Sequence, residues 1–313
     1  MSPKVSICIA TWKRKEKLNR IILNLEDQTM DPTEYEVIVV DSNSPDGTDI
    51  LMKDLCAKYP NIVYISDADN ILAVKRNVGI RNAKAETIVF MDDDVIPNDA
   101  FVESHYIANK NNNDTFFCGQ IRFPHDLVNN SNYYCFRDEQ HLQDKDIGVD
   151  LPFNRIVVMN LSFRKSFIEK VGYVNEEFIG YGDEDIEFGY RVVKSGFKIR
   201  YLPNALGIHE EESSGIKEYG RKLYKAGLYG DRILRKECIE AYNALEGKRI
   251  IGYFLAVKPI CECIAKYLDK NDTNTNKYSY YLYKMYLYGM SYRGRLDQKK
   301  HNELSADMAK TGW

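Results

Sequence analysis

The sequence predicts an α/β protein in which helices flank a mostly parallel β-sheet, followed by a helical extension. Short runs rich in Val and Ile alternate with segments of helical periodicity, and the runs lie at 4–10, 36–40, 61–65 and 88–91. Such alternation is typical of right-handed strand–helix–strand units. With 313 residues, 44% of them hydrophobic, the chain is long enough for one large or two modest domains.

Helical segments are expected between these strands and beyond them. Apolar residues recur at helical spacing within 15–25, and further helices are expected at 48–59, 71–83, 98–109 and 164–171. Additional strands are expected at 115–123, 155–159, 197–201 and 205–208, whereas the polar stretch 124–153 has no assignment. The predicted domains are 1–216, with halves 1–95 and 96–216, and a mostly helical extension at 217–313.

The fourth strand ends in three carboxylates, Asp92, Asp93 and Asp94. In open α/β sheets, ligands bind beyond the carboxyl ends of the strands. Adjacent negative charges repel one another unless a cation neutralises them, and oxygen ligands favour Mg²⁺ or Mn²⁺. If the strand continued, Asp92 and Asp94 would point one way and Asp93 the other. An exposed acidic turn is the alternative interpretation.

Other polar residues are expected at the same edge of the sheet. Thr11 and Asp41 end the first two strands, and Lys75 and Arg76 begin the helix before the fourth. A carboxylate can accept the imide N–H of uracil, while an arginine and a metal ion held by Asp94 can neutralise a diphosphate. Together these residues predict a site for a nucleoside diphosphate.

A second cluster lies in the segment GYGDEDIEFGYRV, which starts at residue 180. Its first two glycines allow close approach of a ligand, and Asp183, Glu184 and Asp185 open a helix. Helix capping explains one or two acids, so one of the others is a candidate base for an acceptor hydroxyl. His209 follows a short apolar run and is a candidate metal ligand, although a single histidine is more often structural.

Composition points to a cytoplasmic protein. The apolar run at 5–10 is too short for a secretory signal, and no stretch reaches the roughly 20 apolar residues of a membrane span. Seven cysteines without a CxxC pair indicate thiols in a reducing compartment.

Charge is distributed unevenly along the chain. Residues 217–313 contain 19 Lys and Arg against 11 Asp and Glu, a net charge of +8, whereas residues 1–216 carry −11. This basic, Tyr-rich extension is expected to associate peripherally with an anionic membrane, to hold an anionic acceptor, or to present an ordinary solvated face. An apolar stripe in it is expected to pack against the catalytic domain, with a sugar-stacking or membrane-facing surface as the alternative: Tyr281, Met285, Tyr288 and Tyr292.

Residues 3–212 resemble the nucleotide-sugar glycosyltransferases of family 2, which have the GT-A fold. The similar segments occur in the family's order: VSICIATWKR, VIVVDSNSPDGT, KRNVG, FMDDD, NLSFRKSF, and GYGDEDIEFGYRV followed by IHE. The last group is especially similar to galactosyl- and N-acetylhexosaminyltransferases with a Gly-Glu-Asp motif, including bacterial chondroitin polymerases. The extension resembles nothing that we can name.

The resemblance implies a role for each matching residue. Residues 1–95 would be the nucleotide-binding half and 96–216 the acceptor-binding half. The donor nucleotide sugar would be held by Thr11, Arg14, Asp41, Arg76, Asp92 and Asp93. Mn²⁺ or Mg²⁺ would be bound by Asp94, His209 and Asp92. Asp185 would be the catalytic base, and Glu184 would bind the acceptor together with Asp183 and Tyr181, two positions where close relatives often have Gly or Trp.

The implied reaction is a single displacement with inversion, in which a sugar moves from a UDP-sugar to a saccharide or lipid-linked saccharide during surface glycan synthesis. Asp185 would take the acceptor proton, and no nucleic acid would be involved. Retaining or protein-directed transfer and a catalytically inactive nucleotide-binding module are the alternatives. The enzyme would work in the cytoplasm, with peripheral association at the inner face of the membrane.

Overall fold

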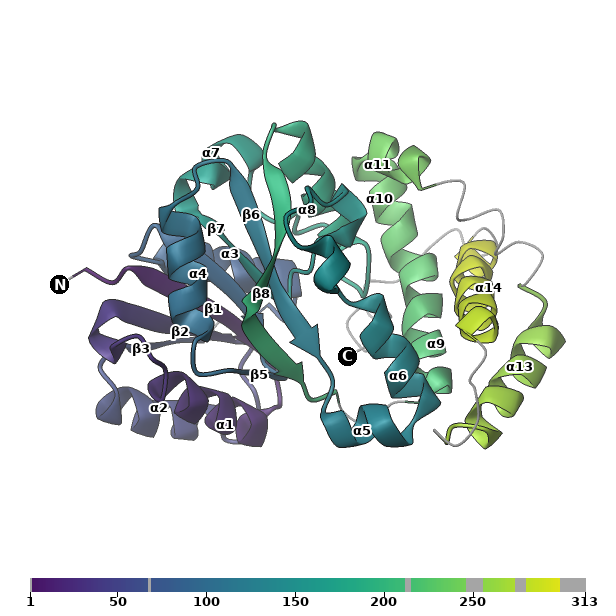
Figure 1. The fold of residues 1–313 in the computed structure, drawn as a ribbon, viewed down its shortest axis with the longest axis horizontal. Helices are drawn as coiled ribbons and strands as arrows, with labels where there is room; N and C mark the ends of the chain where they lie inside the picture. The colour runs from purple at the N-terminus through teal and green to yellow at the C-terminus, as the bar shows by residue number, and fades with distance from the viewer. Residues whose placement is uncertain (1, 67–68, 212–214, 246–255, 274–279, 299–313) are drawn as a thin grey trace. The chain divides into compact units, whose positions relative to one another are not determined.

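The computed structural model describes residues 2–66, 69–211, 215–245, 256–273 and 280–298 (Figure 1). The chain forms two compact units. The first contains residues 1–122, 141–176 and 188–210, and the second contains residues 123–140, 177–187 and 211–313. The predicted boundary at 216 therefore lies near the point where the chain enters the second unit for the last time, but two earlier segments belong to that unit as well.

An eight-stranded sheet forms the centre of the first unit, in the order β3-β2-β1-β4-β7-β6-β8-β5. The strands β3, β2, β1 and β4 run parallel to one another, and β6 is parallel to β8. In contrast, β7 pairs antiparallel with β4 and β6, and β5 pairs antiparallel with β8. The mostly parallel α/β fold is therefore confirmed. The strand bounds are β1 (Val5–Thr11), β2 (Tyr35–Asp41), β3 (Ile62–Ser66), β4 (Thr87–Asp92), β5 (Val95–Pro97), β6 (Thr115–Arg122), β7 (Asn160–Arg164) and β8 (Lys198–His209).

Helices cover both faces of this sheet because its strands are apolar on both sides. On one face, α1 (Lys15–Glu26), α2 (Thr48–Lys58) and α4 (Phe101–Lys110) share one apolar core with the sheet. On the other face, α3 (Leu72–Asn82), α7 (Ile168–Val171) and the later turns of α8 (Glu184–Lys194) share a second core. In β1, Cys8 belongs to the second core and its neighbours Ile7 and Ile9 to the first, as alternation in a strand requires.

Two predicted strand assignments in this unit were wrong. Residues 155–159 do not form a strand: a 3-10 turn (Phe153–Arg155) comes first, and β7 begins only at Asn160. The apolar run was misleading because Ile156 and Val158 enter the core from irregular backbone. The two short strands expected at 197–201 and 205–208 are one strand, β8, whose pairing with β6 shifts register at Gly119.

The second unit is helical and contains residues 124–140 of the polar stretch that had no assignment. That stretch forms α5 (His125–Asn130) and α6 (Asn132–Gln140), and the remainder contains α9 (Ile216–Lys225), a π-helical turn η5 (Ala226–Gly230), α10 (Asp231–Glu237), α11 (Ile239–Ala244), α13 (Lys258–Lys270) and α14 (Tyr280–Gln298). Its aromatic core includes Phe136 stacked on Tyr283, with ring centroids 4.8 Å apart. Among the described residues, no helix is long and apolar enough to cross a membrane.

The predicted apolar stripe of the extension was wrong. The buried aromatic residues of α14 are Tyr283 and Tyr286, whereas Tyr281 is 77% exposed. Tyrosines occupy several sides of this helix, so spacing alone does not identify the face that packs.

Candidate functional site

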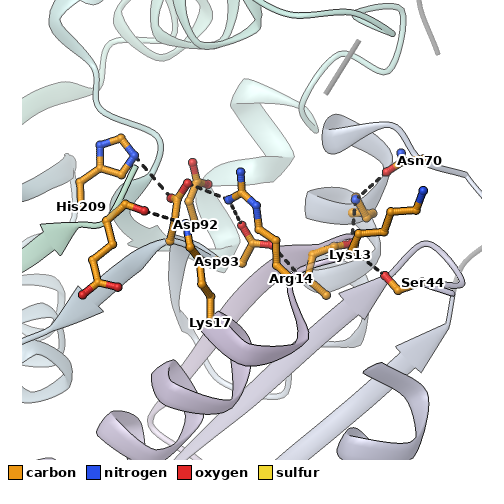
Figure 2. A network of polar contacts seen from close by, with 12 residues as sticks. Lys13, Arg14, Lys17, Ser44, Asn70, Asp92, Asp93 and His209 are labelled. Carbon is orange, nitrogen blue, oxygen red and sulfur yellow. Dashed lines mark hydrogen bonds and ion pairs between the residues drawn. The ribbon is translucent and has the colours of Figure 1, made fainter. Parts of the chain in front are cut away.

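The three aspartates do not continue the strand. β4 ends at Asp92, Asp93 and Asp94 form a turn, and β5 follows. The expectation that Asp92 and Asp94 point one way and Asp93 the other was therefore wrong. Asp93 and Asp94 both pair with the Arg14 guanidinium, while Asp92 pairs with that of Arg76. Arg14 Nη1 lies 2.6 Å from Asp93 Oδ1 and 2.7 Å from Asp94 Oδ2 (Figure 2). Arg76 Nη2 lies 3.0 Å from Asp92 Oδ1.

Asp93 is buried beneath this network. Its Oδ2 accepts a hydrogen bond of 2.8 Å from the hydroxyl of Thr11, the last residue of β1. Burial raises the pKa of the Asp93 carboxyl to about 6, although the adjacent Arg14 guanidinium acts in the opposite direction. The parallel pairing of β1 with β4 thus places Thr11 and the aspartates at one edge, as the sequence predicted.

Asp94 lies beside His209, the last residue of β8. The register of the antiparallel β5–β8 pair sets Val95 opposite His209, and the imidazole Nε2 lies 3.6 Å from Asp94 Oδ1. Burial would raise the pKa of Asp94, but His209 and Arg14 hold it well below its usual range. Of the three candidate ligands, Asp94 and His209 are buried, whereas the Asp92 side chain is 26% exposed. In the part of the chain that the structure describes, no three His, Cys, Asp or Glu side chains converge as a preformed metal site.

Asp41 ends β2 and is fully buried. Its carboxylate accepts hydrogen bonds from the Ser44 hydroxyl at 2.5 Å, the Ser44 backbone N–H at 3.0 Å and the Tyr64 hydroxyl at 2.9 Å. A carboxylate has about four lone-pair sites, so these bonds leave room for one more donor. The polar turn after β2 is therefore fixed by Asp41, whose predicted contact with a nucleobase stays a prediction.

Lys75 was expected at this edge without a role of its own, whereas Asn70 and Ser44 were not predicted as site residues (Figure 2). Lys75 Nζ donates to the Thr11 carbonyl at 3.0 Å and to Asn70 Oδ1 at 3.1 Å, and burial lowers its pKa to about 8. Ser44 accepts a 2.7 Å hydrogen bond from the backbone of Lys13, which has a φ of 55°. Its partner Asp41 was identifiable at a strand end, but Ser44 lies in a polar turn where sequence gives little signal.

The segment 180–185, which we call the acidic loop, belongs to the second unit. It contains the other four predicted site residues: Tyr181, Asp183, Glu184 and Asp185. Asp183 has a φ of 69° and Gly182 a φ of 102°, both in the left-handed region. The Glu187 backbone N–H donates to the Asp183 carbonyl at 3.0 Å and so forms the first turn of α8, which carries Glu184 and Asp185 at its start. Burial raises the pKa of Tyr181. The sequence prediction of an acidic helix start preceded by glycines is thus confirmed, whereas the roles of these residues stay predictions.

Comparison with known protein families identifies the family of this chain. The model of glycosyl transferase family 2 matches residues 6–162, half of the chain, and that of the N-terminal domain of galactosyltransferase matches residues 140–212. The chain belongs to glycosyl transferase family 2.

Curated relatives are distant and mostly longer. Hyaluronan synthase of Pasteurella multocida is 27% identical over 257 residues, which cover 71% of this chain and 26% of that protein. The uncharacterized glycosyltransferase YfnE of Bacillus subtilis is 24% identical over 261 residues, or 68% of this chain and 66% of that one. The aligned part of this chain therefore spans about a quarter of the hyaluronan synthase and about two thirds of YfnE.

Solved structures share the fold. A mannosyltransferase from Pyrobaculum calidifontis in complex with GDP-Man and Mn²⁺ has a TM-score of 0.55 at 16% identity, covering 75% of this chain and 65% of that one. Residues 1–349 of Staphylococcus aureus TarS give a TM-score of 0.53 at 12% identity over 96% of this chain and 93% of that one. The chain accordingly has the GT-A fold, with a helical C-terminal region.

Proposed function

We propose that this protein transfers a sugar from a nucleoside diphosphate, UDP in the first place, to a saccharide or lipid-linked saccharide acceptor. The observation that carries the proposal is the convergence of Asp94 and His209, which are 115 residues apart in sequence and 3.6 Å apart in space. Asp94 also pairs with Arg14, which precedes α1, and the neighbouring Asp93 accepts a hydrogen bond from Thr11 at the end of β1. The relatives named above include a hyaluronan synthase, which supports a glycan acceptor.

The residues present fit a divalent cation. Asp94 supplies a carboxylate and His209 an imidazole, a donor pair that suits Mn²⁺ and also accepts Mg²⁺, and Asp92 is the third proposed ligand. Bound there, the cation would supply positive charge for the departing diphosphate. The structural relative with GDP-Man and Mn²⁺ supports this assignment. Arg14 already neutralises Asp94 in the structure, so we expect its guanidinium to turn toward the diphosphate when donor and cation bind.

Asp185 is proposed as the general base in a single displacement with inversion. Asp185 would take the proton of the attacking hydroxyl. Glu184, Asp183 and Tyr181 would hold the acceptor sugar in place. Thr11, Asp41, Arg76 and Asp93 would hold the donor. An α-linked donor should then give a β-linked product.

Calorimetry with UDP, GDP, CDP and TDP, with and without Mn²⁺, tests the donor site. We expect one nucleotide, UDP, to bind at least about tenfold more tightly with Mn²⁺. The matched variant Asp94→Asn keeps the side-chain shape but loses the charge, so it should abolish the Mn²⁺ effect. Binding that is equal for all four nucleotides, or indifferent to Mn²⁺ in the unaltered protein, would contradict the proposal.

The basic extension is proposed to hold the protein against an anionic membrane surface. Helix α13 exposes Lys258, Lys266 and Lys270, and its exposed apolar side chains include Ile260 and Tyr267. Each lysine near such a surface contributes on the order of 1 kcal/mol. The cytoplasmic face of a membrane, where anionic lipids are concentrated, is the site that this chemistry fits.

A further inference from the structure

A π-helical turn in the second unit lies between the acidic loop and the last described helix. α9, η5 (Ala226–Gly230) and α10 follow one another without leaving helical backbone, because Lys225 and Asp231 on either side of η5 both have α-helical dihedrals. A π turn inserts one extra residue into a helix and occurs frequently at functional sites. Here the turn brings two different backbone surfaces against two different neighbours.

One surface of η5 contacts the acidic loop without intervening side chains. A methyl group at Gly230 would lie 2.2 Å from the carbonyl oxygen of Gly182 and 3.3 Å from Asp183 Cβ. A methyl group at Gly182 would lie 2.5 Å from Ala226 Cβ. Since real Cβ atoms do not approach other atoms so closely, these positions exclude any larger residue unless the loop moves.

A different surface of η5 contacts α14 in the same way. A methyl group at Gly227 would lie 2.0 Å from the Ser291 carbonyl oxygen, and one at Gly294 would lie 2.1 Å from the Tyr224 carbonyl oxygen. Figure 1 shows α14 in the helical region that contains α9 and α10. The last described helix is thus packed backbone to backbone on the turn that contacts the loop.

Polar contacts reinforce the packing of α14 on this segment. Arg295 Nη2 lies 3.0 Å from Asp231 Oδ1, and the Asp231 side chain is only 4% exposed. The side-chain amide of Gln298 donates to the Leu228 carbonyl at 3.1 Å. A buried ion pair is costly to break because it leaves one charge without its partner, so α14 cannot shift easily relative to η5.

The loop itself requires such support. Asp183 and Gly182 both have positive φ, and a residue other than glycine persists in that region only when its surroundings hold it there. Asp183 also supplies the carbonyl that begins α8, the helix that carries Asp185. A displacement of η5 would therefore be transmitted to the start of that helix.

We infer that α14 and η5 position the acidic loop, so that Gly230, Gly294 and Arg295 are positioning residues for acceptor catalysis. The inference rests on the proposed function insofar as it assigns Asp185 as the base. The C-terminal extension would then be part of the transferase machinery as well as a membrane contact. It would hold the acceptor-binding loop in place without altering the proposed donor edge, by which we mean the strand-end site of Thr11, Asp41 and Asp92–Asp94 with Arg14 and Arg76.

Hydrogen exchange of the full-length protein, followed by mass spectrometry of peptides covering 180–187, tests the physical link without any substrate. Gly294→Ala, which alters α14 only, should accelerate exchange in these peptides about tenfold, and Gly230→Ala should do so at least as strongly. Gly215→Ala is the matched control in the same helical segment, because its methyl group would meet nothing closer than 3.9 Å. It should leave exchange within about twofold.

Turnover of the UDP-sugar selected by the binding panel tests the catalytic consequence. Gly294→Ala should lower kcat about tenfold while KM for the UDP-sugar and the affinity for UDP with Mn²⁺ stay within about twofold of the unaltered protein. Since a general loss of structure would change both kcat and donor binding, this split separates positioning from unfolding.

The two failures are distinguishable. If the unaltered protein turned over none of the UDP-sugars, the proposed function would fail, while the exchange data would still decide whether α14 holds the loop. If Gly294→Ala unfolded the chain, Arg295→Met, which removes one cation without adding volume, would replace it with the same expected results. Unchanged exchange at 180–187 in a folded Gly294→Ala or Arg295→Met variant would overturn the inference, as would an equal effect of Gly215→Ala.

Discussion

The donor edge of the first unit and the acidic loop of the second are built in different ways. At the donor edge, strands end together, and charged side chains complete the structure: Arg14 bridges two aspartates and Arg76 binds the third. In the acidic loop, backbone conformation does this work, through two residues with positive φ and glycines packed against a helix. The first arrangement tolerates movement of long side chains, whereas the second tolerates almost no added volume.

This difference separates binding from chemistry in the proposed reaction. Flexible cations can exchange a carboxylate for a diphosphate, as donor binding requires. A general base must instead lie within hydrogen-bonding reach of one hydroxyl, and small displacements are costly in rate. We therefore expect substitutions at the donor edge to alter affinity and substitutions in the loop to alter kcat.

Asp185→Asn should produce the largest effect, and it tests directly whether the loop acts on kcat rather than on donor affinity. The amide keeps the shape of the carboxylate but cannot accept the proton, so kcat should fall by about 10²- to 10⁴-fold. Calorimetric affinity for UDP with Mn²⁺ should remain within about twofold, because that site is attributed to other residues. Glu177→Gln changes an exposed carboxylate of the same unit that has no role in the proposed site, so this matched control should keep turnover within about twofold. Full turnover by Asp185→Asn would show that the base has been assigned wrongly.

The meeting of polar residues at one edge of the sheet could be predicted from sequence because each strand end is a local pattern. A buried strand must end somewhere, parallel strands end at one edge, and polar residues such as Thr11 and Asp41 at those ends are easily read. What sequence did not reveal is which cation neutralises which acid. Arg14 reaches Asp93 and Asp94 across about 80 positions of chain, a pairing fixed only by the neighbouring positions of β1 and β4.

The second unit was less predictable for physical reasons that its residues make clear. The helices α5 and α6 come from polar sequence, and their aromatic side chains become a core only by meeting α14. The buried face of α14 was assigned wrongly because tyrosines such as Tyr281 and Tyr283 lie on different sides of one helix, and packing alone distinguishes them. No sequence motif announced that Gly230 and Gly294 contact neighbouring backbone.

A second prediction concerns the rigidity behind the donor edge. His105 is fully buried, with Nδ1 2.8 Å from Ser162 Oγ and Nε2 2.9 Å from Asn160 Oδ1, and Asn160 pairs in register with Met91, next to Asp92. Burial lowers the pKa of His105 to about 4. The unfolded chain therefore binds a proton that the folded chain excludes as the pH falls below about 6.5, so stability is lost toward acid.

The expected loss of unfolding free energy from His105 is about 2 kcal/mol between pH 7 and pH 5, since each pKa unit corresponds to about 1.4 kcal/mol. Denaturant unfolding at both pH values measures it. His105→Gln should flatten the acid side of the stability curve even if it lowers stability overall, whereas the exposed control His125→Gln should leave the curve unchanged. Parallel curves for His105→Gln and the unaltered protein would argue that the imidazole does not stay neutral, and that the donor edge lacks the fixed support proposed for it.

The smallest expected effect concerns the charge difference between the two parts of the chain and their binding to a membrane. Residues 1–216 are acidic and residues 217–313 basic, so an anionic surface should attract only the extension. Full-length protein should sediment with vesicles containing anionic phosphatidylserine and be released as salt is raised toward about 0.5 M.

Lys266→Gln on the exposed face of α13 should weaken this binding about fivefold at low salt, equivalent to about 1 kcal/mol. Lys53→Gln, an exposed lysine of α2 in the acidic part of the chain, is the matched control and should bind as the unaltered protein does. Equal weakening by both substitutions would mean that net charge rather than the extension drives association, and binding that is insensitive to salt would point to the apolar side chains of α13 in place of its lysines.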